Sequence, residues 1–219
     1  MKPPRYKGVP PIRFFPPACA FLLLSVLLPV KAGAEGGWEI TPYIGYHAGG
    51  SFEDNTTGAG LDVKEGESFG LIIDLPDTGE TQYELFYGFQ RTQVAGGGTF
   101  GEEPLFDLDI HYLHLGGTYM FPEGKVRPYV AGGLGATHFS PRGSGPGAKT
   151  YFSLSLGGGA KIRLSGRVGL RLEGRGVLTI LPDSTEIFCV SGGGAACRVD
   201  VRGDVFGQLL FLAGITFSP

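Results

Sequence analysis

Residues 167–181 read RVGLRLEGRGVLTIL and alternate between two kinds of side chain. The odd positions include Arg171, Glu173 and Arg175, whereas the even positions are valine, leucine, isoleucine and two glycines. Successive side chains of a β-strand point to opposite faces, so this alternation predicts a strand with one charged face and one apolar face. The segment is longer than the about five or six residues of a typical soluble strand. It reaches the roughly 9–11 tilted residues with which a strand crosses a bilayer.

The same alternation recurs along the chain and predicts an all-β fold. We expect eight strands, at residues 38–52, 68–75, 82–94, 106–121, 127–139, 150–164, 167–181 and 205–217. Their connections alternate between short turns, at 76–80, 122–125 and 165–166, and long loops, at 53–67, 95–105, 140–149 and 182–204. Short turns that alternate with long loops are typical of transmembrane barrels. The sequence therefore predicts an eight-stranded antiparallel up-and-down transmembrane β-barrel.

The charged faces of these strands are assigned to the barrel interior. Eight strands enclose a space just wide enough for side chains to fill it, which leaves the apolar faces to lipid. The predicted interior charge network consists of Glu84, Lys161, Arg163, Arg171, Glu173 and Arg175. The strand at 106–121 fits neither face cleanly, because Asp109 and His111 share one face with leucines. A bulge, or an exit of this strand above the membrane, is needed there.

A soluble, lipocalin-like barrel is the alternative geometry, because it would bury the apolar faces around a ligand and expose the charges. The sorting of loop lengths favours the membrane barrel, since a soluble barrel has no reason to sort them. Aromatic residues near the strand ends also favour it, because girdles of such residues mark the two membrane interfaces. These aromatic residues are Trp38, Tyr43, Tyr46, Tyr119, Phe121, Tyr129 and Phe217.

The first 34 residues differ from the rest and predict a cleaved signal peptide. Four basic residues precede the apolar run 18–30, and the small-residue site Ala32-Gly33-Ala34 follows it. This order is that of a secretory signal, and the run is too short for the roughly 20 apolar residues of a membrane helix. We expect cleavage after Ala34 and a mature barrel domain at 35–219.

Composition excludes several classes of protein. Glycine accounts for 39 of the 219 residues without a Gly-X-Y period, which excludes collagen, and 42% hydrophobic residues argue against disorder. The pI near 5.8 argues against a nucleic-acid binder, which carries a basic stripe. Residues 1–34 contain five of the 18 basic residues and no acidic one, so the predicted mature chain has 13 basic and 21 acidic residues, a net charge of −8.

Several segments resemble the eight-stranded outer-membrane β-barrels of Gram-negative bacteria, the OmpA/OmpX-like superfamily. They are residues 83–87 (YELFY), 127–135 (RPYVAGGLG), 169–175 (GLRLEGR) and 212–217 (LAGITF). The resemblance implies an integral outer-membrane protein with a structural or cell-surface interaction role, and we expect a monomer that is not an open general porin. It also implies outer-membrane lipid and lipopolysaccharide as surroundings. The barrel-assembly machinery would recognise the last strand through Phe217, although Ser218 and Pro219 follow it.

Cys189 and Cys197 are the two cysteines of the predicted mature domain, and both fall in the last long loop. Exported proteins meet an oxidising environment, so an even pair of cysteines predicts a disulfide. Closing so short a loop contributes about 2–3 kcal/mol to stability in the chain-entropy description. Metal binding is the alternative, and the sequence around the pair offers no histidine to support it.

We expect no cofactor and no metal site. Residues 143–150 (GSGPGAKT) look like a phosphate loop, but Ala148 stands where that motif requires glycine, and a strand follows instead of a helix. His111 and His114 are three residues apart on a strand, so they point to opposite faces and do not bind one metal. The acidic residues of the long loops are best interpreted as a solvated outer face, with divalent cations as the alternative. They are Glu53, Asp54, Asp62, Glu65, Glu67, Glu102 and Glu103.

The sequence His138-Phe139-Ser140 places a histidine and a serine on one face of a strand, as in the lipid A deacylases, which are also eight-stranded barrels. An enzyme would also need an acidic group to orient the histidine, and after Ser140 the next acidic residue on a predicted strand is Glu173. We therefore predict that the protein is not an enzyme. A lipid A-modifying enzyme and a small pore are the alternatives to a closed structural barrel.

Overall fold

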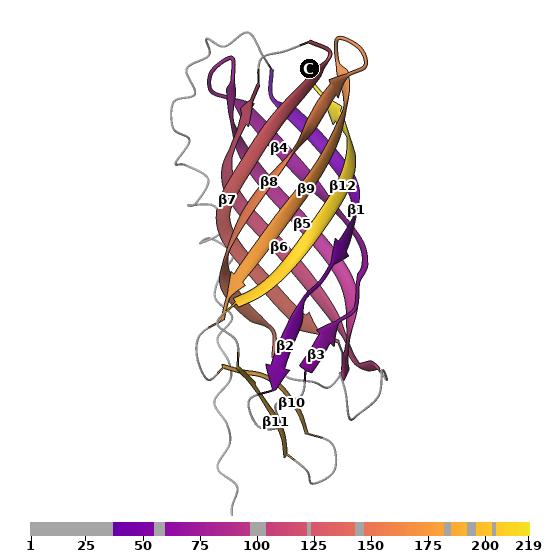
Figure 1. Ribbon diagram of the computed structural model, residues 1–219, viewed down its shortest axis with the longest axis vertical. Coiled ribbons are helices and arrows are strands. Elements are labelled where there is room, and N and C mark those ends of the chain that lie inside the picture. The colour runs from indigo at the N-terminus through magenta and orange to yellow at the C-terminus, as the bar shows by residue number, and fades with distance from the viewer. Residues whose placement is uncertain are drawn as a thin grey trace, which may run out of the picture. The chain divides into compact units, whose positions relative to one another are not determined.

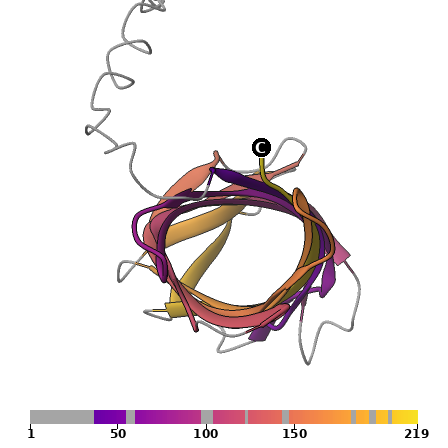
Figure 2. The same ribbon diagram turned by 90° about the horizontal axis from the view of Figure 1, so that it is seen from above.

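The computed structural model describes residues 37–54, 60–96, 104–121, 124–142, 147–181, 185–191, 196–202 and 205–219. All regular elements within these residues are β-strands. Eight of them form the predicted closed antiparallel barrel, which is seen from the side in Figure 1 and along its axis in Figure 2. They are β1 (Glu39–Ala48), β4 (Gly66–Pro76), β5 (Thr81–Gly96), β6 (Pro104–Met120), β7 (Val126–Pro141), β8 (Lys149–Arg163), β9 (Val168–Ile180) and β12 (Val205–Phe217).

The barrel closes because β1 pairs with β4 on one side and with β12 on the other. This seam sets Tyr43 opposite Gly214 and Ile40 opposite Phe217. Around the ring the strands follow the order β1, β4, β5, β6, β7, β8, β9, β12. Strands four places apart in this order stand on opposite walls, so β4 faces β8, β5 faces β9 and β6 faces β12.

The two ends of the barrel differ. The short connections β4–β5, β6–β7 and β8–β9 lie at one end, which we call the turn end, and the opposite end is the loop end (Figure 1). Beyond the loop end the sheet continues in four short strands, β2 (Ser51–Asp54), β3 (Gly60–Val63), β10 (Thr185–Ser191) and β11 (Ala196–Arg202). In this extension β3 pairs with β5, β2 with β3, β11 with β2, and β10 with β11.

The extension corrects two of the expected boundaries. Parts of the segments predicted as loops at 53–67 and 182–204 are strands, and they lack a long apolar alternation because they lie beyond the part of the barrel that faces lipid. The strand predicted at 38–52 is divided into β1 and β2 at Gly49 and Gly50. Their φ angles are 78° and 114°, a region that glycine enters without steric cost and that ends the regular strand.

The exterior of the barrel is apolar over most of its height. On β12 burial alternates at every residue, and the outward Leu209 and Phe211 are 54% and 59% exposed. Each barrel strand contributes such side chains, for example Ile44, Phe69, Tyr83, Leu115, Leu134, Leu156, Leu178 and Phe211. An outward apolar band of this kind is what a transmembrane barrel presents to lipid.

No helix among the residues described above is long and apolar enough to span a membrane.

The mixed face predicted at 106–121 arises because β6 extends beyond the apolar band. Asp109, His111, Leu113 and Leu115 all point outward. The pairing of β6 runs without a register shift from Leu108 to Met120 with β7 and from Phe106 to Tyr119 with β5, so no bulge lies within the mixed face. The apolar band ends between Leu113 and His111, and β6 continues beyond it toward the loop end.

Candidate functional site

The interior near the turn end contains a cluster of ion pairs, here called the ionic layer. Its members come from six strands of the barrel wall and point inward. They are Glu39, Asp74, Gln82, Glu84, Tyr129, Lys161, Arg171, Glu173 and Arg175. All of these except Glu39 are buried.

Lys161 forms the part of the ionic layer closest to the turn end. Its Nζ donates hydrogen bonds to Glu39 Oε2 at 2.6 Å, to Asp74 Oδ2 at 2.8 Å and to Gln82 Oε1 at 2.8 Å. An ammonium group has three donors, so these three acceptors use all of them. Strand β8 is thereby tied to β1, β4 and β5 across the interior.

Two arginines of β9 form the centre of the layer. Arg171 donates to Asp74 at 2.9 Å, to Glu84 at 2.6 Å and to Glu173 at 2.6 Å. Arg175 donates to Glu84 at 2.7 Å and also to Glu173. The Cζ atom of Arg171 lies 4.7 Å from the ring centre of Tyr129, which adds a cation–π contact to the ion pairs.

These bonds span the full width of the barrel. Lys161 of β8 reaches Asp74 of β4, and Arg175 of β9 reaches Glu84 of β5, and in both cases the two strands stand on opposite walls. These bonds place charged side chains across the middle of the interior at the ionic layer.

The structure brings five of the six residues of the predicted charge network together, namely Glu84, Lys161, Arg171, Glu173 and Arg175. Arg163 does not belong to the cluster, because it is the last residue of β8 and is exposed at the turn end. Alternation along a strand predicts the face on which a residue lies, but not where the strand leaves the barrel.

The sequence analysis missed four members of the layer, Glu39, Asp74, Gln82 and Tyr129. Asp74 had a detectable signal, because it is the one charged residue of the predicted strand at 68–75. Tyr129 had none, since it was interpreted as a girdle aromatic although it points inward and donates a hydrogen bond to Glu173 at 2.6 Å. Tyr43 was assigned to the girdle as well and is also buried in the interior.

The interior near the loop end is filled differently, by a group of buried apolar side chains here called the apolar layer. It consists of Val94, Leu108, Ile110, Phe139, Val177 and Phe206. The rings of Phe139 and Phe206 meet edge to face with centres 5.5 Å apart. Next to this layer Tyr112 of β6 donates a hydrogen bond to Gln208 of β12, which again joins opposite walls.

Buried polar side chains lie between the two layers. His47, Ser68 and Gln90 come from the adjacent strands β1, β4 and β5 and are almost completely buried. Among the described residues their side-chain nitrogen and oxygen atoms have no hydrogen-bond partner. The His47 ring stacks on Tyr112 at 5.2 Å between centres. This is the least satisfied part of the interior.

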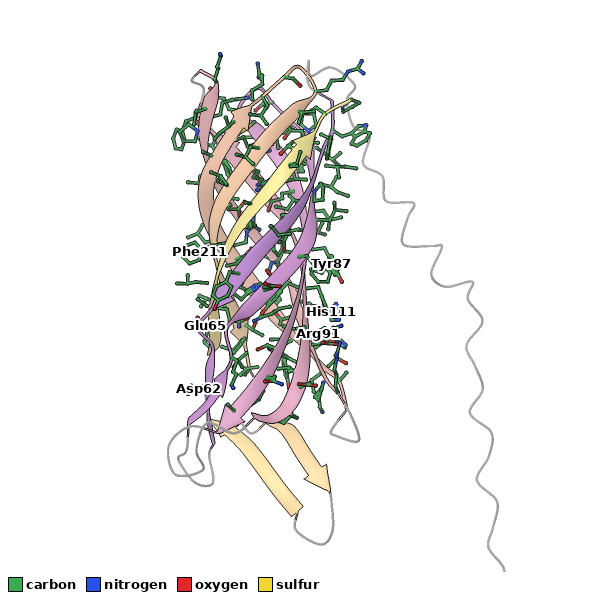
Figure 3. All side chains as sticks on the ribbon, turned by 90° about the vertical axis from the view of Figure 1, so that its right-hand side faces the viewer. Asp62, Glu65, Tyr87, Arg91, His111 and Phe211 are labelled. Atoms are coloured by element: carbon green, nitrogen blue, oxygen red, sulfur yellow. The ribbon has the colours of Figure 1, made fainter. Side chains whose placement is uncertain are left out.

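A row of outward side chains marks the edge of the apolar band that is nearer the loop end. The pairing of β5, β6, β7 and β8 places Phe89, His111, His138 and Thr150 side by side. Figure 3 shows His111 together with Tyr87 and Arg91 on the same side of the barrel. His111 therefore lies outside the barrel, whereas His114, three residues later, is buried inside it.

The structure also shows the surroundings of His138 and Ser140. His138 Nδ1 lies 2.7 Å from Thr150 Oγ1, and no hydrogen bond joins His138 to Ser140 in the described residues. Asp109 stands opposite Ser140 on β6, an acidic residue that the sequence analysis overlooked. Its carboxylate accepts a hydrogen bond from Arg142 at 2.8 Å instead of orienting His138. The side chains here do not form a nucleophile–base pair.

Three further predictions concern residues 1–34, the two cysteines of the mature domain and Phe217. Residues 1–34 lie outside the described residues, so the signal peptide stays a prediction. Cys189 and Cys197 lie on β10 and β11, where the backbone register sets Cys189 opposite Arg198 and Cys197 opposite Val190. The disulfide also stays a prediction. Phe217 is the last residue of β12 and is half exposed.

Comparison with known proteins identifies the class of this barrel. Residues 18–187 match the family described as "Outer membrane protein beta-barrel domain", and the chain belongs to this family. The family places the protein in the outer membrane. No curated protein matches the sequence.

Two solved structures support the fold. Neisserial surface protein A is similar over 84% of this chain and 97% of its own, with 14% identity and a TM-score of 0.57. The outer membrane protein OprG from Pseudomonas aeruginosa is similar over 84% of this chain and 96% of its own, with 13% identity and a TM-score of 0.59. At these identities the likeness concerns the fold alone.

Proposed function

We propose that the protein is a closed outer-membrane barrel with a structural or cell-surface interaction role, and that it does not conduct ions or solutes as a general porin. The observation that carries this proposal is the set of bonds between opposite walls. Arg175–Glu84 and Lys161–Asp74 cross the ionic layer, and Tyr112–Gln208 crosses the interior beside the apolar layer. A solute would have to break both arrangements to pass.

The two layers oppose permeation for different reasons. An ion that entered the ionic layer would have to separate buried charge pairs, and breaking such a pair costs about 3–5 kcal/mol. At the apolar layer the ion would lose its hydration without gaining a polar partner. Under this proposal two levels of the interior oppose permeation, and the protein acts through its outer surfaces.

The loop end is the surface that we assign to contacts outside the cell. In transmembrane barrels of this class the longer connections face outward and the short turns face the periplasm. The extension formed by β2, β3, β10 and β11 would then project from the membrane. The apolar band would contact outer-membrane lipid and lipopolysaccharide. We further propose that the barrel is a monomer and that the barrel-assembly machinery recognises the last strand at Phe217.

Planar bilayer recordings test the proposal. The full-length barrel, refolded and inserted into the bilayer, should give no reproducible conductance steps. A variant that removes one partner of each crossing bond and opens the apolar layer, Asp74→Ala, Glu84→Ala, Gln208→Ala and Phe206→Ala, should conduct and serves as the positive control. The matched control is Arg163→Ala, which changes an exposed arginine and should behave as wild type. Reproducible steps from the wild type would instead establish a small pore.

A separate measurement tests for enzyme activity. Lipid A extracted from cells with and without the gene should have the same acyl chains by mass spectrometry, because no histidine–serine hydrogen bond is formed at His138 and Ser140. A change in acyl pattern that is lost in Ser140→Ala would make the protein a lipid A-modifying enzyme.

A further inference from the structure

Two histidines form a pair on the outer surface that the closed-barrel function does not use. His111 of β6 and His138 of β7 are directly opposite each other in the sheet, and their ring centres are 6.1 Å apart. Both side chains point outward and are partly exposed at the edge of the apolar band. The sequence analysis compared His111 only with His114, which it assigned to the opposite face, and the register between β6 and β7 reveals a histidine on the same face.

Hydrogen bonds orient both rings in the same way. His111 Nδ1 lies 3.0 Å from the hydroxyl of Tyr87, and His138 Nδ1 lies 2.7 Å from the hydroxyl of Thr150. If each Nδ1–H donates to its hydroxyl oxygen, the lone pair of each ring is on Nε2. No other described residue makes a hydrogen bond to either Nε2. Histidines that bind metals are commonly held through their second ring nitrogen in this manner.

From this geometry we propose that His111 and His138 bind one divalent transition-metal ion of the zinc and copper class through their Nε2 atoms. Imidazole nitrogen is a preferred ligand of these metals. Two rings that bind a tetrahedral zinc ion at about 2.0–2.1 Å per bond have centres roughly 5 Å apart. The ring centres of His111 and His138 are 6.1 Å apart, about 1 Å more than that. Small rotations of these exposed side chains would bring the rings to the required distance.

Asp109 lies two residues before His111 on the same outward face and pairs with both Arg91 and Arg142. Because two arginines outweigh this one carboxylate, the affinity for a cation has to come from the two imidazole rings and not from the surrounding charge. No group of three His, Cys, Asp or Glu side chains within the described ranges is placed to hold a metal. Two protein ligands, with water in the other positions, therefore define this site.

The other histidines do not compete for the metal. The chain contains four histidines, and the remaining two, His47 and His114, are buried in the interior. An added metal that binds to histidine on the folded barrel therefore reports on His111 and His138. Because the pair lies outside the barrel, metal binding neither needs nor disturbs the closed interior.

Titration of the folded full-length barrel in detergent with ZnCl₂ and CuCl₂ tests the proposal. We expect one ion per barrel by calorimetry, and a Cu²⁺ electron paramagnetic resonance spectrum with coupling to two nitrogens. His111→Gln and His138→Gln should each weaken binding at least about ten-fold, since even loss of an orienting partner costs a metal site about 10–100-fold. Tyr87→Phe, which removes only the hydroxyl at His111, should weaken binding less than His111→Gln.

Arg163→Ala is the matched control, because it alters a surface residue at the opposite end and should leave metal binding unchanged. Heat-modifiable gel mobility shows whether each variant is folded. The proposal is overturned if the wild type binds no metal at millimolar concentrations, if binding survives in the double variant His111→Gln/His138→Gln, or if only one of the two histidines is needed.

Discussion

The two layers of the interior fill the same barrel with opposite chemistry. The ionic layer near the turn end is built from buried arginines, a lysine and carboxylates, which bond across the barrel. The apolar layer near the loop end is built from aliphatic and phenyl side chains without charges. The difference shows that a lipid-facing apolar exterior does not require a polar interior. It is enough that the charges of the ionic layer are paired with one another and that the apolar side chains of the other layer are packed together.

The comparison also predicts how each layer responds to change. Charges in the ionic layer are compensated only by one another, so removal of one member leaves its partners buried without compensation. Apolar side chains are held by packing rather than by charge compensation, so removal of one leaves a cavity whose cost depends on how far its neighbours relax. The following substitutions test this contrast, starting with the largest expected effect.

Glu173→Ala should have the largest effect on stability. Glu173 accepts hydrogen bonds from Arg171, Arg175 and Tyr129, and its loss leaves two buried guanidinium groups short of a partner. We expect the free energy of unfolding to fall by about 3–5 kcal/mol. Urea titration of the refolded barrel, followed by gel mobility, measures this free energy of unfolding. An unchanged unfolding midpoint would show that the ionic layer does not stabilise the barrel.

Phe206→Ala should destabilise the apolar layer by about 3 kcal/mol, at the lower end of the range for removal of a buried phenylalanine. Its ring packs against Phe139 and is fully buried. The same urea titration applies, and Phe206→Leu should recover most of the loss because it refills the volume. If Phe206→Leu is as unstable as Phe206→Ala, the loss does not come from the cavity.

Gln90→Leu should raise the stability by about 1 kcal/mol, because it removes a buried amide that has no partner among the described residues. Gln90 lies between the two layers, so the substitution extends the apolar layer toward the ionic one. A rise in the thermal unfolding temperature is the expected result. A fall of similar size would show that the amide is satisfied in the membrane-embedded protein.

Arg163→Ala should change the free energy of unfolding by less than about 0.5 kcal/mol, as is usual for an exposed position without specific contacts. The residue carries the same charge as Arg171 and was assigned to the same network from its sequence position. A fall in the free energy of unfolding as large as that expected for Glu173→Ala would show that Arg163 belongs to the ionic layer.

The sequence was informative wherever one physical requirement governs every residue. The demand that one face of each strand meets lipid explains why β8, β9 and β12 could be recognised from alternation alone. It also explains why Arg171, Glu173 and Arg175 were assigned to one face. The extension formed by β2, β3, β10 and β11 was not recognised, because beyond the membrane no face has to be apolar.

What the sequence determined by itself is the closed antiparallel barrel and the face on which each charge lies, because both follow from a period of two residues. Only the tertiary structure decided which of these charges meet. Ring order places β5 opposite β9, so Glu84 meets Arg175 across 91 positions of the chain. Register likewise sets His111 beside His138. Alternation specifies the face of a strand to which each side chain points. Which side chains meet depends on the closure of the barrel and on the register of all eight strands.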